Sequence, residues 1–150
     1  MPPITVNVGE ILEVNQNNEI RTRGCDPCVG LIVIYDAGGG NLIKRCAHFT
    51  VNFAGPYTQD RIDQALNPIL NNFFQPIGII SVGYTWGGGA AGMGSNFICN
   101  NLDIYFADFN PVSSNNNDSI TSNGANVQLL NNQHWAFTNI PPLNNNADLN

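Results

Sequence analysis

The sequence predicts an α+β domain in which two mixed or antiparallel β-sheets face each other and one main helix covers an outer face. Three observations support this prediction. Short β-favouring runs occupy much of the chain, one segment has the apolar spacing of an amphipathic helix, and 150 residues are enough to bury one core. We expect a single domain over residues 1–140 and a polar C-terminal tail at residues 141–150.

Eight runs have the composition of strands and are bounded mostly by Gly, Pro or Asn. They lie at residues 4–8, 10–14, 28–36, 41–53, 77–86, 96–109, 126–130 and 134–140. The segment Ala37-Gly38-Gly39-Gly40 joins the third run to the fourth, and Gly tolerates the positive φ of tight turns. These two runs are therefore expected to pair as an antiparallel hairpin. The polar segments 111–126 and 141–150 are expected to be a mobile loop and tail.

The helix is predicted at residues 58–73. Thr58 or Asp60 supplies its N-cap, and apolar residues follow at helical spacing: Ile62, Leu66, Ile69, Leu70 and Phe73. The apolar stripe is expected to pack against a sheet. Pro68 predicts a kink or an early end within this helix.

Composition argues against several classes of function. The net charge is −6 and no Lys or Arg follows Arg61, so the C-terminal part offers nothing to neutralise a phosphate backbone. No stretch approaches the ~20 apolar residues of a membrane span, and the first ten residues lack the features of a signal peptide. We expect neither nucleic acid nor membrane as a partner, and a location in the cytoplasm or delivery into a host cell without a cleavable signal peptide. The Gly-rich segment 86–94 lacks the Lys-Ser/Thr ending of a phosphate-binding loop and is expected to form a rim facing a substrate.

Groups able to do chemistry are concentrated between Arg21 and Phe49. This segment holds three of the four Cys, one of the two His and four of the five basic residues. A thiol becomes a useful nucleophile when a neighbouring imidazole takes its proton and a third group orients the imidazole. Cys28 opens the first hairpin strand and His48 lies late in the second, so the register decides whether they meet.

The same segment resembles the CheD-like chemoreceptor glutamine deamidases and their relatives, among them the catalytic domain of cytotoxic necrotising factor. The matching pattern is Thr22, then five residues containing Gly24, then Cys28 opening an apolar strand that ends Tyr-Asp. A Gly-containing turn and a strand bearing Ala47-His48-Phe49 complete it. The resemblance covers about 30 of the 150 residues.

The resemblance implies roles for three residues and a reaction. Cys28 is implied as the nucleophile, His48 as the general base and acid, and Thr22 as the group that accepts the imidazole N–H through its hydroxyl or its main-chain carbonyl. The implied reaction is cysteine-dependent hydrolysis of a glutamine side-chain amide in a protein substrate, without a cofactor, by a bacterial receptor deamidase or a toxin-like effector. Backbone N–H groups at the Gly24–Cys28 turn are candidates for the oxyanion site. We expect a monomer acting on a protein that presents an exposed glutamine.

Two other interpretations of these residues stay open. Cys25, Cys28, Cys46 and His48 supply the four ligands of a structural zinc site, as in a non-enzymatic interaction module. Free Cys is also often a small buried hydrophobic residue, which is the interpretation we favour for Cys25, Cys46 and Cys99. His134 is expected to pack or to lie at a rim in a late strand, and Gln128 and Gln133 are candidates to assist a substrate amide by residue type alone.

Overall fold

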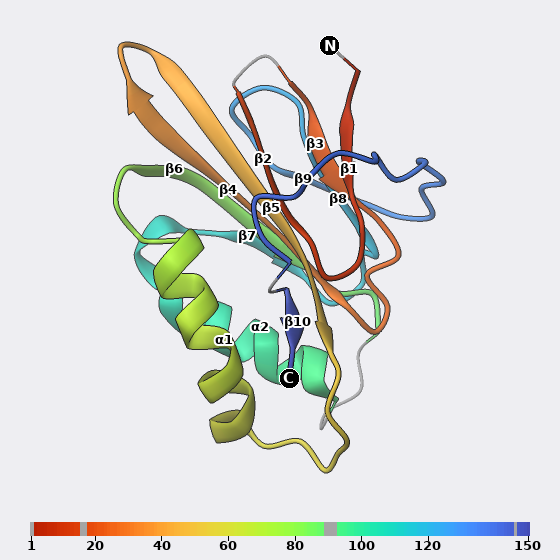
Figure 1. Cartoon of the computed structure of the whole chain (residues 1–150). Coiled ribbons are helices and arrows are strands. Elements are labelled where there is room, and N and C mark those ends of the chain that lie inside the picture. Colours follow the sequence, from red (N-terminus) through yellow and green to blue (C-terminus); the bar gives the residue numbers. More distant parts are fainter. Residues whose placement is uncertain (1, 16–17, 89–92, 146) are drawn as a thin grey trace.

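A computed structural model describes residues 2–15, 18–88, 93–145 and 147–150 (Figure 1). Residues 89–92, in the Gly-rich segment predicted as a substrate-facing rim, lie outside the described ranges. The first half of the chain forms β1 (Ile4–Val6), β2 (Ile11–Asn15), β3 (Ile20–Thr22), β4 (Val29–Gly38), β5 (Asn41–Val51) and α1 (Gln59–Phe73). The second half forms β6 (Ile79–Thr85), α2 (Gly94–Tyr105), the 3-10 turn η1 (Ala107–Phe109), β7 (Val112–Ser114), β8 (Ser119–Ser122), β9 (Gln128–Leu130) and β10 (Asp148–Leu149).

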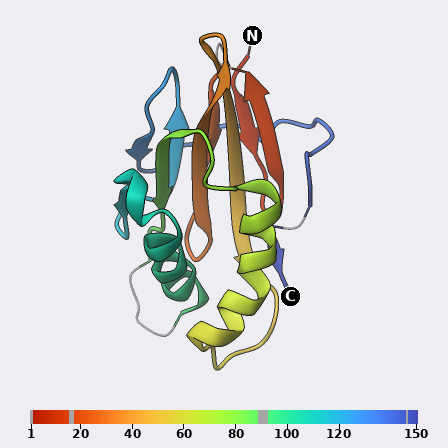
Figure 2. The ribbon, with the colours of Figure 1, turned by 90° about the vertical axis from the view of Figure 1, so that its left-hand side faces the viewer.

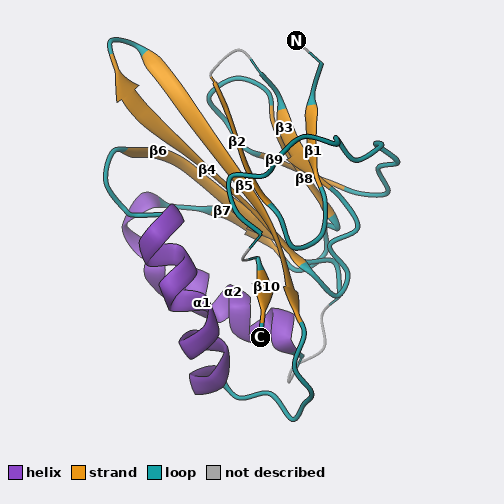
Figure 3. Cartoon of the chain, viewed as in Figure 1, coloured by secondary structure: helices purple, strands orange, loops and turns teal. Residues whose placement is uncertain are grey.

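The strands form two sheets, which confirms the predicted α+β fold with a two-sheet core. The large sheet has the order β10-β5-β4-β6-β7, with β2 paired to β5, and the small sheet has the order β1-β3-β8-β9. In Figure 1 the small sheet lies on one side of the large sheet and both helices lie on the other. Figure 2 shows α1 and α2 side by side in front of the large sheet, and Figure 3 shows the same separation of helices from strands by colour. The architecture is therefore three layers, of helices, large sheet and small sheet.

The large sheet contributes to one hydrophobic cluster on each face. Because side chains alternate along a strand, Leu31 and Val33 of β4 point to the helices, whereas Ile32 and Ile34 point to the small sheet. The helix-side cluster also contains Leu66, Leu70 and Phe74 from α1 and its C-cap, and Leu102 from α2. The inter-sheet cluster is smaller and contains Ile20 and Ile120 from the small sheet.

The helix and the hairpin form as predicted. Thr58 caps α1 by accepting a hydrogen bond from the backbone N–H of Arg61 at 3.2 Å, and the helix runs past Pro68 to Phe73, so it does not end early. Strands β4 and β5 pair antiparallel across the Gly39-Gly40 turn, where both glycines have positive φ. This pairing places Gly30 opposite His48 and Val29 opposite Phe49.

The predictions for the second half of the chain were partly wrong. Residues 96–109, predicted as a strand, form most of α2 and the turn η1, because Ile98 and Leu102 lie four residues apart and pack together on the sheet. The polar segment 111–126 contains β7 and β8, and residues 134–140 contain no strand. Within the described ranges, no helix combines the length and the apolar composition needed to cross a membrane.

The segment predicted as a polar tail belongs to the fold. Leu143 and Asn144 donate backbone hydrogen bonds to Ile11, and β10 pairs parallel with β5 at Thr50 and Val51. Ala147 and Leu149 are buried in the helix-side cluster. The C-terminal residues therefore cover the edges of β2 and β5, where unpaired backbone groups would otherwise be exposed.

Candidate active site

Thr22, His48 and Cys28 come from three strands that meet at one end of the inter-sheet space. Thr22 is the last residue of β3 in the small sheet, His48 lies in β5, and Cys28 immediately precedes β4. His48 shares its face of β5 with Cys46, a member of the inter-sheet cluster, so its ring points toward the small sheet. Thr22 shares its face of β3 with Ile20 of the same cluster and approaches from the opposite side.

Thr22 contacts His48 directly through its hydroxyl. Thr22 Oγ1 lies 2.6 Å from His48 Nδ1 and 2.8 Å from the backbone carbonyl oxygen of Val6, and both side chains are completely buried. The carbonyl of Val6 only accepts, so it takes the single hydroxyl hydrogen of Thr22, and Oγ1 in turn accepts Nδ1–H from the ring. This arrangement leaves Nε2 as the unprotonated nitrogen of His48. Nε2 is buried and has no hydrogen-bond partner among the described residues.

The surroundings of His48 keep its ring neutral. Burial, and to a smaller extent the positive charge of Arg23, lowers the pKa of His48 to about 4. At neutral pH the imidazole is therefore uncharged, with a proton on Nδ1 and a lone pair on Nε2. A ring in this state can accept a proton but carries none on Nε2 to donate.

Cys28 lies beside His48 on the same face of the large sheet, offset along the strands. The register continues from Val29 opposite Phe49, so Cys28 lies beside Thr50, and a hydrogen bond from the Thr50 side chain lowers the pKa of its thiol. Burial outweighs this effect and raises the pKa of Cys28, as do the charges of Asp148 and Asp26. Cys28 and His48 thus occupy diagonal positions on neighbouring strands, which typically places Cα atoms about 7–8 Å apart. The structure joins Thr22 to His48 and does not join His48 to Cys28 by a hydrogen bond.

Gly30 makes room for this arrangement, a role not expected from the sequence. A Cβ atom at Gly30 would lie 2.9 Å from Ile120 Cγ2, 3.0 Å from Cys25 Sγ and 3.0 Å from Thr22 Cγ2. Because Gly30 is opposite His48, the missing side chain lets Thr22 reach the ring from the small sheet. A Gly inside a strand pattern is the signal that could have indicated such a close approach.

Of the other cysteines, Cys25 and Cys46 have the properties of buried structural residues, whereas Cys99 is only partly buried. Burial raises the pKa of Cys25, Cys46 and Cys99, that of Cys99 to about 12, and all four cysteines of the chain are free thiols. Among the described residues, no group of three or more His, Cys, Asp or Glu side chains is arranged to hold a metal ion. The four residues of the alternative zinc site, Cys25, Cys28, Cys46 and His48, are therefore not brought together as a ligand set.

The turn before Cys28 offers fewer oxyanion donors than its sequence suggests. The N–H of Cys25 donates to Asp118 O and that of Asp26 to Gly24 O, at 2.9 and 2.8 Å, and Pro27 has no N–H. Of the turn predicted to supply the oxyanion site, only the N–H groups of Gly24 and Cys28 remain as candidates. A pocket of about 80 Å³ is lined by Pro27 and Thr50, the neighbours of Cys28, although Cys28 itself is not part of its lining. The rest of its lining is Val51, Tyr57, Met93, Gly94 and Ser95.

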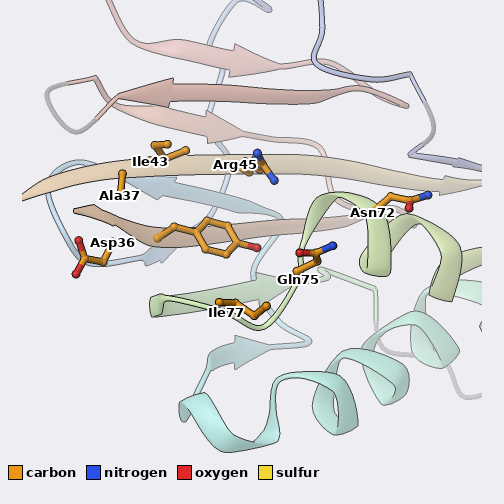
Figure 4. A pocket seen from close by; sticks show the side chains of 8 residues that line it. Asp36, Ala37, Ile43, Arg45, Asn72, Gln75 and Ile77 are labelled. Carbon is orange, nitrogen blue, oxygen red and sulfur yellow. The ribbon is translucent and has the colours of Figure 1, made fainter.

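Other cavities lie away from Cys28. One of about 420 Å³ is found at the tip of the hairpin, where Ile43 and Arg45 of β5 face Gln75 and Ile77 of the loop after α1 (Figure 4). It also includes Asp36, eight residues along the chain from Cys28, which corresponds to roughly 25 Å of strand.

The remaining polar candidates also lie outside the inter-sheet space. His134 and Gln128 are exposed, and Gln133 donates to Asn131 O at 2.9 Å.

Comparisons with known proteins leave the family of the chain open. No protein-family model matches the sequence, and no curated protein matches it either.

Proposed function

We propose that the protein is a cysteine-dependent protein-glutamine deamidase with Cys28 as nucleophile, His48 as general base and acid, and Thr22 as the residue that orients His48. The observation that carries this proposal is the hydrogen bond between Thr22 Oγ1 and His48 Nδ1. It leaves Nε2 buried and without a partner in the described part of the chain, and the register extended by one residue from Val29 puts Cys28 on the same face of the sheet. A nucleophile, a base and an orienting group are the three parts of a catalytic triad.

The proposed reaction passes through a thioester. Cys28 Sγ attacks the glutamine carboxamide carbon while His48 Nε2 takes the thiol proton, and a C–S bond forms. His48 returns this proton to the amide nitrogen, the C–N bond breaks and ammonia leaves. Nε2 then deprotonates a water molecule that attacks the thioester, the C–S bond breaks, and glutamate and the Cys28 thiol are released. A primary amine in place of water gives transglutamination.

The resting geometry fits a general-base mechanism better than a preformed ion pair. Burial lowers the pKa of His48 and raises that of Cys28, so both groups are neutral at pH 7. The reaction requires Nε2 and Sγ to approach each other, and catalytic hydrogen bonds often tighten only when substrate binds. The Thr50 side chain, which bonds the thiol, is placed to stabilise the thiolate as it forms. The small pocket beside Pro27 and Thr50 is the proposed route by which a glutamine side chain reaches Cys28.

The test is mass spectrometry of candidate proteins or a host lysate after incubation with the protein. We expect a gain of about one dalton at specific glutamines, the change from amide to acid that hydrolysis through a thioester produces. Cys28→Ser should abolish the change, whereas Cys25→Ser, three residues away and buried, should retain it if the variant folds. Deamidation that persists in Cys28→Ser and disappears in a folded Cys25→Ser would contradict the assignment of the nucleophile.

A further inference from the structure

Residues Trp135–Thr138 lie against the outer face and edge of the small sheet, where β1 and β3 run side by side (Figure 1, blue). These two strands carry the partners of the His48 contact: Thr22 Oγ1 from β3 and Val6 O from β1. Arg21 and Arg23 flank Thr22 in sequence. Because side chains alternate along a strand, both arginines point outward while Thr22 points inward to His48.

Both arginines are held by this C-terminal segment. The guanidinium carbon of Arg21 lies 4.4 Å from the centroid of the Trp135 ring, and that of Arg23 lies 4.1 Å from the centroid of the Phe137 ring. Arg23 Nε also donates to the backbone oxygen of Trp135 at 2.5 Å. Two cation–π contacts and one charged hydrogen bond therefore fix the residues on either side of Thr22.

The same segment holds β1 next to Val6. The N–H of Thr5 donates to Thr138 Oγ1 and the N–H of Thr138 donates to Thr5 O, each at 2.9 Å. Arg21 Nε donates to Thr5 Oγ1, also at 2.9 Å, which ties β1 to β3 through a side chain. β1 is a three-residue edge strand, and three-residue strands have few ladder bonds of their own.

We propose that Trp135–Thr138 is a positioning segment for His48. By holding β1 against β3, it keeps the Thr22 hydroxyl within hydrogen-bond distance of Val6 O. Because Thr22 donates its hydrogen to Val6 O, its oxygen accepts the hydrogen of His48 Nδ1. When this hold is lost, Val6 O moves away from Thr22, and the freed hydroxyl hydrogen turns toward Nδ1. The ring proton then moves to Nε2, the nitrogen that the proposed reaction needs as a base. The effect on turnover rests on the proposed function, whereas the effect on the tautomer does not.

The chain offers a convenient background for the test. It contains two histidines, and the second, His134, is exposed and adjoins the segment. In a His134→Ala protein, His48 is the only imidazole, so its two ring nitrogens are assigned without ambiguity by ¹⁵N NMR. This protein is the reference, and Trp135→Ala/Phe137→Ala is introduced into it.

The reference should show a protonated Nδ1 and an unprotonated Nε2. The double variant should populate the other tautomer, and deamidation should fall about 10- to 100-fold in kcat with KM within about twofold, as for small misplacements of a catalytic group. If the double variant does not fold, Trp135→Leu, which keeps apolar bulk without the aromatic ring, should shift the tautomer to a smaller extent. A folded variant with the reference tautomer would overturn the inference. A shifted tautomer in the double variant, together with no deamidation by the reference protein, would support the positioning segment and contradict the deamidase.

Discussion

The two faces of β5 are both buried, yet they differ in chemistry. Ala47 and Phe49 point to the helices and join a cluster built from apolar side chains on both sides. Lys44, Cys46 and His48 alternate with them and point into the inter-sheet space. A strand covered on both faces is expected to be apolar throughout. The helix side also carries a polar residue, Arg45, but it is only half-buried, so the fully buried polar side chains of β5 all lie on the inter-sheet face. This difference suggests that the inter-sheet space serves more than packing.

Lys44 and His48 show two different uses of a buried polar side chain. Lys44 Nζ donates to Asn18 O at 3.2 Å and to Ser122 O at 3.1 Å, and burial lowers its pKa. His48 has one ring nitrogen bonded and one without a partner among the described residues. A buried polar atom without a partner is costly and calls for an explanation. Lys44 ties strands together, whereas the Nε2 lone pair of His48 contributes to no such contact among the described residues. This is the lone pair that the proposed reaction uses.

The largest expected effect is a loss of turnover when the hydroxyl of Thr22 is removed and the shape of its side chain is kept. Thr22→Val keeps the shape of the side chain and removes the hydroxyl that accepts from Nδ1, so turnover should fall by about 10²- to 10⁴-fold. Thr22→Ser keeps the hydroxyl and should retain most of the activity. The measurement is kcat for deamidation of one substrate by all three proteins. Equal rates for Thr22→Val and the parent protein would show that the hydroxyl does not orient His48 for the reaction.

The part of the site that could be predicted from sequence is the part encoded locally. Thr22, Cys28 and His48 lie within one segment, and the turn glycines between them predict that the two hairpin strands pair. The contact of Thr22 with His48 follows from how the small sheet packs on the large one, and that packing depends on Gly30, Val6 and Ile120. The offset of Cys28 from His48 follows from a register that residue types alone do not specify.

The elements of the fold also differ in how far the local sequence predicts them. Helix α1 could be predicted because Thr58 caps it and its apolar residues have a clear period. The sequence predicts a strand where α2 forms, because β-favouring residues such as Phe97, Ile98 and Tyr105 outweigh a weaker helical spacing. Strands β7 and β8 arise in an Asn- and Ser-rich segment because the neighbouring strands β6 and β3 offer edges to pair with. Tertiary pairing therefore overrode local composition in the second half of the chain.

A smaller effect is expected on stability in acid. Burial lowers the pKa of His48 from 6.5 to about 4, so between these values the unfolded chain binds a proton that the folded chain does not. The free energy of unfolding should therefore decrease as pH falls from 6.5 toward 4, with a loss of about 3 kcal/mol from this one residue. Urea unfolding at several pH values measures the loss in the parent protein and in His48→Gln. His134→Ala serves as the control, because its histidine is exposed. The same pH dependence in the parent and in His48→Gln would mean that His48 does not carry this penalty.

The smallest effect should come from Gly30→Ala. The added methyl group would lie 2.9 Å from Ile120 Cγ2, closer than real Cβ contacts permit, and 3.0 Å from Cys25 Sγ and Thr22 Cγ2, which is unusually tight. These neighbours in and beside the small sheet must therefore shift. Overpacking of this kind typically costs about 1–3 kcal/mol. The shift should also lengthen the Thr22 Oγ1 to His48 Nδ1 distance beyond its present 2.6 Å and weaken the hold on the tautomer. Urea unfolding gives the loss of stability, and the ¹⁵N shifts of the His48 ring report the hydrogen bond. A destabilised variant with unchanged ¹⁵N shifts of the His48 ring would show that Gly30 serves packing alone. The hydrogen bond between Thr22 and His48 would then survive the overpacking between the two sheets.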